Sequence, residues 1–134
     1  MTIADCQRIE VPEIRDARGS LVVWENAVPF TPKRVFVIHD VQDGAPRGDH
    51  AHRECHEVVV PIGGAVDVVV DDGQDRSVVT LEGPHQGLHL TPMNWLLLPH
   101  IPPGVALMVL CSHPYDPEDY IRDRTEFDAL VGAS

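Results

Sequence analysis

The amino-acid sequence predicts an all-β domain, a barrel or a sandwich, that ends in a short helix. Segments rich in β-branched residues recur along most of the chain, and turn residues separate them at intervals of about eight to twelve residues, which is typical of barrels and sandwiches. Near the C-terminus the large apolar residues change to three- and four-residue spacing, which is the period of a helix. The length of 134 residues fits a single domain, expected over 1–134, with a core of its own.

Each expected strand is a short apolar run between turns. The chain begins with a hairpin in which residues 16–19 form the turn. Pro29 and Pro32 end this pairing, because proline cannot donate a hydrogen bond to a sheet ladder. The expected strands after the first turn are 20–24, 34–39, 58–62, 65–70, 77–81, 88–90, 95–98 and 105–111. Pro117 marks the first turn of the expected helix, whose apolar side includes Phe127.

A formal net charge of −11 at pH 7 disfavours binding to nucleic acid or to anionic lipid, since both depend on a positive protein field. No apolar run approaches the roughly 20 residues that span a bilayer, and the N-terminus lacks the pattern of a signal peptide. Cys6, Cys55 and Cys111 are an odd number at no metal-binding spacing, so reduced thiols are expected. These observations predict a cytoplasmic protein.

The stretch with the most chemical content is residues 44–57. His50 and His52 are one residue apart on an extended segment, so their rings are expected on the same side of it. Glu57 leads into the next β-branched run and can bring a carboxylate to the same pocket. The stretch therefore offers a base, an acid and metal-ligand atoms together. The cations that lie near the pair in the chain are Lys33, Arg34, Arg47 and Arg53.

The spacing of this stretch resembles the first signature motif of the cupins, a family of small β-barrels. Gly44 is followed after five residues by His50-x-His52, after four more by Glu57, and after six more by Gly64. The resemblance implies a cupin-type β-barrel (jelly roll). Because many reactions occur on this fold, the fold does not by itself assign one.

Four separate stretches narrow the resemblance. In their order along the chain they are similar to motifs of the dTDP-4-keto-6-deoxyglucose 3,4-ketoisomerases, which are WxcM-like cupins, and they are 33–38, 47–52, 83–88 with Trp95, and 115–122 with Phe127. This resemblance implies an isomerase that binds a dTDP-linked 4-keto-6-deoxyhexose and moves the sugar ketone from C-4 to C-3 in deoxyamino-sugar biosynthesis. It also implies a homodimer that exchanges N-terminal strands and uses no metal or other cofactor.

Carried over by position, the resemblance implies a role for each residue of the motif. His50 is expected to be the base at the sugar carbon, His52 its partner in binding or proton relay, and Arg47 the cation that stabilises an oxyanion or a phosphate oxygen. Imidazole suits these steps because its ordinary pKa of ~6.5 lies near neutral pH. The family also uses a tyrosine from the strand that here covers 34–39. This chain has none there, and His39 is expected to replace it as proton shuttle, since Phe36 cannot carry a proton.

Glu57 stands where the family is expected to carry glutamine. With His50 and His52 it completes the metal triad of ordinary cupins, whereas the second cupin motif, which starts at Pro102, has Leu107 where a metal-binding histidine is expected. Two alternatives therefore stay open: a metal-dependent cupin enzyme that uses His50, His52 and Glu57, and a non-enzymatic cupin that binds nucleotide sugars. The residues expected to bind substrate are Lys33, Arg34, Arg53 and Glu57.

Other notable residues have ordinary structural explanations. His56 is oddly spaced relative to His52 and is expected at the surface. Trp95 is expected in the core. The aromatic residues expected to anchor the C-terminal helix on the barrel are Tyr115, Tyr120 and Phe127.

Overall fold

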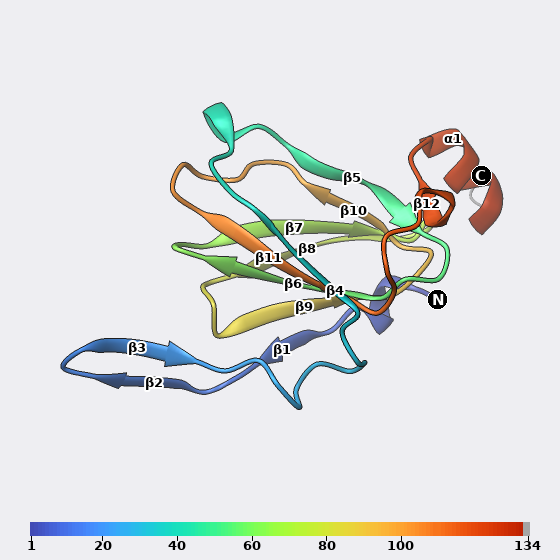
Figure 1. The fold of residues 1–134 in the computed structure, drawn as a ribbon. Helices are drawn as coiled ribbons and strands as arrows, with labels where there is room; N and C mark the ends of the chain where they lie inside the picture. Colours follow the sequence, from blue (N-terminus) through green and yellow to red (C-terminus); the bar gives the residue numbers. More distant parts are fainter. Residues whose placement is uncertain (133–134) are drawn as a thin grey trace.

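The computed structural model describes residues 1–132 and shows two five-stranded antiparallel sheets that face each other (Figure 1). The first sheet has the order β1 (Arg8–Glu10), β9 (Gln86–Leu90), β6 (Glu57–Ile62), β11 (Ala106–Cys111) and β4 (Arg34–Ile38). The second has the order β12 (Tyr120–Ile121), β5 (Arg47–His52), β10 (Trp95–Leu98), β7 (Val66–Asp71) and β8 (Arg76–Leu81). Except for the β7–β8 hairpin, neighbouring strands in these two sheets are not consecutive in the chain, as in a jelly roll.

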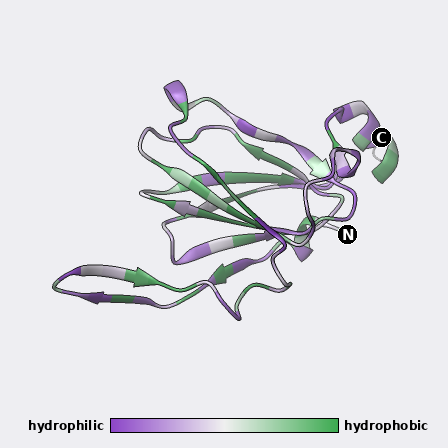
Figure 2. Ribbon diagram, in the orientation of Figure 1, coloured by the Kyte–Doolittle hydropathy of each residue, from purple (hydrophilic) through white to green (hydrophobic). Residues whose placement is uncertain are grey.

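The main core lies between the two sheets. Both sheets contribute side chains that are almost completely buried, and valine and leucine dominate this set, as in Val59, Val68, Val70, Leu88 and Leu107. Figure 2 shows hydrophobic residues concentrated on the strands of the two sheets. The two sheets therefore hold each other by apolar burial, and every side chain that points between them has a fixed position relative to the opposite sheet.

Strand β6 is buried on both of its faces. Val59 points into the main core, while Val58 and Val60 point outward and pack beneath Trp24 and Phe30 of the connection between β3 and β4. A strand that is covered on both sides needs a continuous apolar run rather than an alternating one. This strand leads directly from Glu57, so its rigid packing also positions that carboxylate.

The structure confirms the predicted strands, with ends that differ by at most two residues. A turn at 71–75 joins β7 to β8, and in it the side chain of Asp72 accepts hydrogen bonds of 2.8 Å from the backbone N–H groups of Gln74 and Asp75. The all-β jelly-roll fold with a short C-terminal helix is therefore the fold that the sequence predicts.

The predicted start of the C-terminal helix is wrong. Pro117–Asp119 form a single 3-10 turn (η3), and α1 (Arg124–Val131) begins only after β12. The side chain of Asp123 accepts a hydrogen bond from the N–H of Thr125 and caps this helix. Tyr120–Ile121 pair with the end of β5, and this tertiary contact overrides the local helical spacing. No helix in residues 1–132 is long and apolar enough to cross a membrane.

An N-terminal hairpin, β2 (Glu13–Asp16) and β3 (Gly19–Val22), extends away from the two sheets (Figure 1). Within residues 1–132 its strands pair only with each other, whereas β1 pairs with β9 of the same chain. Every residue of β2 is exposed. The exchange of N-terminal strands between two chains stays a prediction.

Candidate functional site

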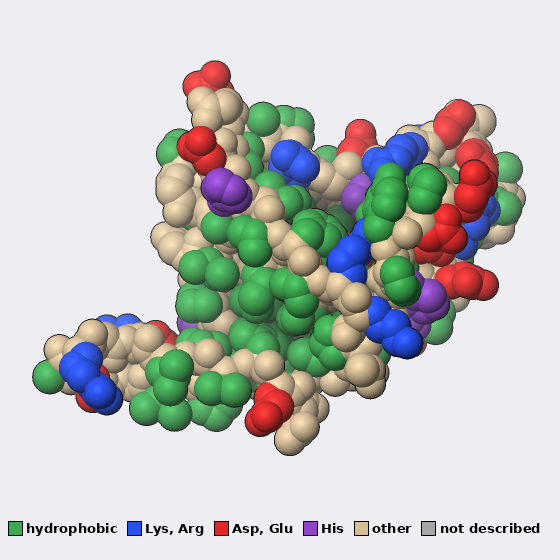
Figure 3. All heavy atoms as spheres, in the orientation of Figure 1, with side chains coloured by type: hydrophobic (Ala, Val, Ile, Leu, Met, Phe, Trp, Pro, Cys, Tyr) green, Lys and Arg blue, Asp and Glu red, His purple; other side chains and the backbone are tan. Residues whose placement is uncertain are grey.

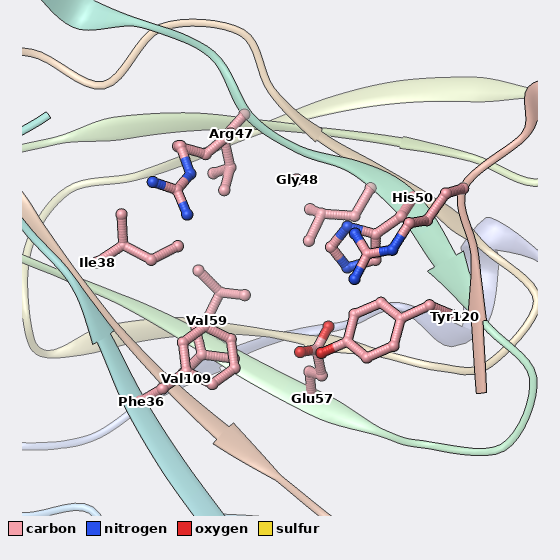
Figure 4. Close-up of a pocket in the computed structure, with 12 residues that line it drawn as sticks. Phe36, Ile38, Arg47, Gly48, His50, Glu57, Val59, Val109 and Tyr120 are labelled. Atoms are coloured by element: carbon pink, nitrogen blue, oxygen red, sulfur yellow. The ribbon is translucent and has the colours of Figure 1, made fainter. Parts of the chain in front are cut away.

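A bulge in β5 turns the histidine motif toward the space between the sheets. Gly48 and Asp49 have φ values of 79° and 64°, and the ladder pairs His50 and then Gly48 with consecutive residues of β10. Strict alternation places residues three apart on opposite faces of a strand. Because Asp49 is the extra residue of the bulge, Arg47 and His50 instead line one cavity (Figure 4).

The cavity between the sheets has a volume of about 210 Å³. Its polar lining is Arg47, His50, Glu57, Tyr120 and Arg122. Its apolar wall is Phe36, Ile38, Val59, Leu96, Leu98 and Val109. Pockets that enclose a drug-sized ligand measure about 300–1,000 Å³, so this cavity suits one small part of a larger ligand, such as a sugar ring.

The two imidazole rings lie side by side at the polar end of the cavity. Their ring centroids are 5.1 Å apart and their planes cross at 83°. His50 lines the cavity, whereas His52 is 5% exposed and is not part of the lining. His50 can therefore contact a ligand directly, whereas His52 can act on a ligand only through its neighbours.

His52 is held between two carboxylates. Its Nδ1 lies 2.8 Å from an oxygen of Asp119, and its Nε2 lies 3.4 Å from an oxygen of Glu57. Asp119 also accepts hydrogen bonds from the backbone N–H groups of Glu54 and Cys55, at 2.7 and 3.3 Å. Asp119 thereby joins η3 to the turn after β5 and orients the His52 ring.

The surroundings separate the pKa values of the two histidines. Burial lowers the pKa of His50 below its ordinary value of 6.5, and a charge on His52 acts in the same direction, against the Glu57 carboxylate. Burial also acts to lower the pKa of His52, but the carboxylates of Glu57 and Asp119 outweigh it and raise that pKa. These opposite shifts favour the neutral form of His50, which a base requires, and the protonated form of His52, which is the arrangement of an acid–base pair.

Tyr120 belongs to the cavity, and its predicted role as an anchor of the helix is wrong. Its ring centroid lies 5.1 Å from that of His50 and 4.3 Å from that of His52. Tyr115 is 60% exposed and is no anchor either. Phe127 is fully buried in a cluster with Trp95, which confirms the anchor role of the former and the core position of the latter.

Two further residues of the site were missed by the sequence analysis. Asp119 and Arg122 flank Tyr120, and Arg122 lines the cavity with its guanidinium 4.3 Å from the centroid of the Tyr120 ring. The only signal was that all three fall in the stretch 115–122, which carries part of the family resemblance. No spacing rule indicates that this stretch returns to β5.

The other predicted site residues lie outside the cavity lining. Arg34 stands behind Tyr120, with Nη2 3.3 Å from the phenol oxygen. Arg53 forms an ion pair with Glu126 of α1. Lys33 and His39 are exposed at the two ends of β4. Within residues 1–132, the structure gives no geometric support to substrate binding by Lys33 or Arg53 or to proton transfer by His39.

His56 is not a simple surface residue, which corrects its predicted position. Its Nδ1 lies 3.0 Å from Nε2 of His89, and the two rings stack with their centroids 5.2 Å apart. The ring of Phe30 lies against both, with centroid distances of 6.3 and 6.1 Å. Neither His56 nor His89 lines the cavity that His50 lines, so this pair is not part of the candidate site.

The donor atoms of His50, His52 and Glu57 lie within 4.8 Å of one another, which is close enough to hold a divalent metal ion. Their donor set of two imidazoles and a carboxylate also fits such an ion. However, an imidazolium has no lone pair to offer, and the two carboxylates favour the charged form of His52. Metal binding would therefore compete with the proton on His52.

The chain is similar to sugar ketoisomerases in both sequence and fold. It is 39% identical over 125 residues, 92% of this chain and 90% of the relative, to TDP-4-oxo-6-deoxy-alpha-D-glucose-3,4-oxoisomerase of Aneurinibacillus thermoaerophilus. The crystal structure of a 3,4-ketoisomerase from Helicobacter canadensis matches with a TM-score of 0.90 and 33% identity, over 96% of this chain and 98% of that one. A mutant of the 3,4-ketoisomerase QdtA from Thermoanaerobacterium thermosaccharolyticum, in complex with TDP-4-keto-6-deoxyglucose, matches with a TM-score of 0.89 and 29% identity, over 94% and 93% of the two chains. The family described as WxcM-like, C-terminal matches residues 4–132, and the chain belongs to this family.

Proposed function

We propose that this protein is a sugar 3,4-ketoisomerase that converts dTDP-4-keto-6-deoxyglucose to its 3-keto isomer, a step toward deoxyamino sugars. The observation that carries the proposal is that His50 lines the cavity with its ring centroid 5.1 Å from that of His52, which lies between the carboxylates of Glu57 and Asp119. The substrate is carried over from the relatives, one of which is named for this activity while another holds TDP-4-keto-6-deoxyglucose.

His50 suits proton transfer at a sugar carbon. The C-4 carbonyl acidifies the proton on C-3, removal of that proton gives an enediolate, and return of a proton to C-4 completes the shift of the ketone. A neutral imidazole can take the first proton and return it to the neighbouring carbon. The positive charge that Glu57 and Asp119 favour on His52 stabilises the enediolate that exists between the two steps.

Arg47 and Arg122 suit the binding of a diphosphate. Both line the cavity, and within residues 1–132 neither forms an ion pair with a carboxylate, unlike Arg53 and Arg124. A phosphate oxygen is the matching partner for a guanidinium that has no carboxylate. In a chain with a net charge of −11, these two side chains are therefore the best candidates to hold the anionic part of the substrate.

The proposal is tested by following the substrate in D₂O by NMR. The wild-type protein is expected to convert dTDP-4-keto-6-deoxyglucose to the 3-keto sugar and to place deuterium at C-4, because the proton held on His50 can exchange with solvent before it is returned. A protein that binds the sugar nucleotide without converting it would instead be the non-enzymatic cupin.

The rate of isomerisation is expected to follow a bell-shaped pH profile. Activity rises through the lowered pKa of His50, which must lose its proton, and falls through the raised pKa of His52, which must keep one. The Glu57 carboxylate raises both pKa values, so the Glu57→Gln variant is expected to move both limbs to lower pH. Measurement of kcat/KM from pH 5 to 10 checks this, and an unmoved alkaline limb would exclude His52 as the group that titrates there.

A metal-dependent cupin enzyme is the second candidate, because the donor atoms of His50, His52 and Glu57 converge. The two functions differ in their response to chelation. A ketoisomerase that works through the His50 and His52 proton chemistry is expected to keep its full rate after EDTA treatment, with less than one metal ion per several chains by elemental analysis. Loss of activity that returns with one divalent ion would favour the metal enzyme.

We also propose that the protein is a homodimer. This is supported by apolar side chains that are exposed on one sheet face and on the N-terminal hairpin. Figure 3 shows hydrophobic side chains gathered over β4 and β11. Val35 and Val37 of β4 are each 53% exposed, and Leu21 of the hairpin is 57% exposed. Light scattering is expected to give twice the 14.8 kDa mass of one chain, and a Val35→Asp/Val37→Asp variant is expected to be monomeric. Val78→Asp on β8, which is 60% exposed but lies on the other sheet, is the control that should stay dimeric.

The expected cytoplasmic location is also part of the proposal. Cys55 and Cys111 are free thiols, and both are buried close to the site, where Cys111 Sγ lies 3.7 Å from Glu57. A reducing compartment such as the cytoplasm keeps such thiols reduced.

A further inference from the structure

Tyr120 enters the cavity from the C-terminal part of the chain. β12 pairs with β5 so that Tyr120 lies opposite His52, and this register places the phenol against both imidazole rings. In Figure 4 the ring stands beside His50 with its hydroxyl end toward Glu57. Of the two tyrosines in the chain, Tyr120 is the one that lines the cavity.

The hydroxyl of Tyr120 has a defined direction. Nη2 of Arg34 lies 3.3 Å from the phenol oxygen, and a guanidinium can only donate. The oxygen therefore accepts from Arg34, and the phenol hydrogen is left to point elsewhere. Burial raises the pKa of Tyr120 above its ordinary value of 10, although Arg34 opposes the shift, so the hydroxyl keeps its proton at neutral pH.

The other polar groups of the cavity cannot carry a proton between two sugar oxygens. Glu57 already forms an ion pair with His52, whose Nε2 lies 3.4 Å from its carboxylate oxygen, so it serves as the partner of that ring. Arg47 and Arg122 do not release protons. His50 is needed at carbon. Among the residues that line the cavity in the described part of the chain, Tyr120 has the only hydroxyl group.

We infer that the Tyr120 hydroxyl carries the proton from O-3 to O-4 of the sugar during the proposed isomerisation, and this inference rests on that proposed function. As the ketone moves, the phenol O–H gives its proton to O-4, which changes from a carbonyl to a hydroxyl oxygen. The phenol oxygen takes the proton of the O-3 hydroxyl, which becomes the new carbonyl. His50 moves the carbon-bound proton from C-3 to C-4, so the phenol ends as it began and no oxidant or reductant is consumed.

The test distinguishes proton transfer at the sugar carbons from proton transfer between the sugar oxygens. The Tyr120→Phe variant is expected to lose roughly 10²–10⁴-fold of kcat with little change in KM, because one proton-transfer group is removed. It is still expected to exchange the C-3 proton of recovered substrate with D₂O, since His50 remains and the enediolate can collapse only backward. Tyr115→Phe, which removes the exposed hydroxyl of the neighbouring tyrosine, is expected to match the wild type in both assays.

Three results would overturn the inference. They are a Tyr120→Phe variant with wild-type kcat, a parallel loss of exchange and isomerisation, and a change in KM alone. Arg34→Met is a second variant that leaves the tyrosine ring in place, and it is expected to lower kcat about tenfold because the hydroxyl loses its orienting donor. An unchanged kcat in that variant would also count against the inference. Failure of the wild-type protein to isomerise the sugar would remove the proposed function itself.

Discussion

The His50→Asn variant is expected to lose roughly 10²–10⁴-fold of kcat, the range for removal of a general acid–base group. His50 is the imidazole that lines the cavity, and burial keeps it in the neutral form that a base requires. Asparagine keeps a polar side chain of similar reach but cannot take a proton from carbon. Steady-state kinetics and C-3 deuterium exchange on the same sugar measure the loss, and both are expected to fall together.

His39→Asn is the matched control for this experiment. His39 is exposed after β4 and lies outside the cavity lining, so the variant is expected to keep wild-type kcat. A His50→Asn protein that still exchanges the C-3 proton would assign the base to another group. A large loss in His39→Asn alone would restore the shuttle role that the sequence predicts for this residue.

The Asp119→Ala variant is expected to lower both the free energy of unfolding and the rate. Asp119 accepts hydrogen bonds from His52 and from the backbone N–H groups of Glu54 and Cys55. Their loss leaves the buried His52 ring and the part-buried N–H of Cys55 without this acceptor, which costs about 1–3 kcal/mol, whereas the exposed N–H of Glu54 can bond to water. The pKa of His52 also falls, because one of its two carboxylates is gone, and kcat at pH 8 is expected to drop by at least about tenfold. Urea unfolding and kinetics measure the two effects.

The pH dependence of stability distinguishes this role of Asp119 from a simple packing defect. Burial acts to raise the pKa of Asp119, but the hydrogen bonds from His52 and the backbone lower it below its ordinary value of 3.8. The linked stabilisation is therefore present above that value and is lost as the pH falls through the lowered pKa. The difference in stability between wild type and variant is expected to shrink toward pH 2. Asp116→Ala is the control: its carboxylate caps the same turn through one exposed hydrogen bond, and about 0.5 kcal/mol is expected.

The sequence predicts most of the fold because the strands are locally encoded. The run 58–62 is apolar without interruption, as a strand covered on both faces requires, and the structure places it at the centre of its sheet. The start of the C-terminal helix is not locally encoded in this way. Spacing from Pro117 onward is helical, yet two residues of that stretch pair with β5, and no local pattern reports a partner so far away in the chain.

Part of the candidate site is likewise encoded locally, and part of it depends on the tertiary structure. The alternation of side chains brings His50 and His52 together, and the strand after Glu57 brings that carboxylate to them. Alternation alone would place Arg47 on the other face, and the bulge at Asp49, which is decided by pairing with β10, reverses this.

By itself the sequence determined the strand order along the chain, the paired imidazoles and the carboxylate beside them, because these depend on neighbours a few residues apart. Only the tertiary structure decided which imidazole lines the cavity with a lowered pKa and which is held between carboxylates with a raised one. That choice depends on burial and on Asp119, which reaches His52 from 67 residues further along the chain. The pairing of β12 with β5 also brings Tyr120 and Arg122 into the cavity. β12 adds to the edge of a sheet whose register is set by the packed core.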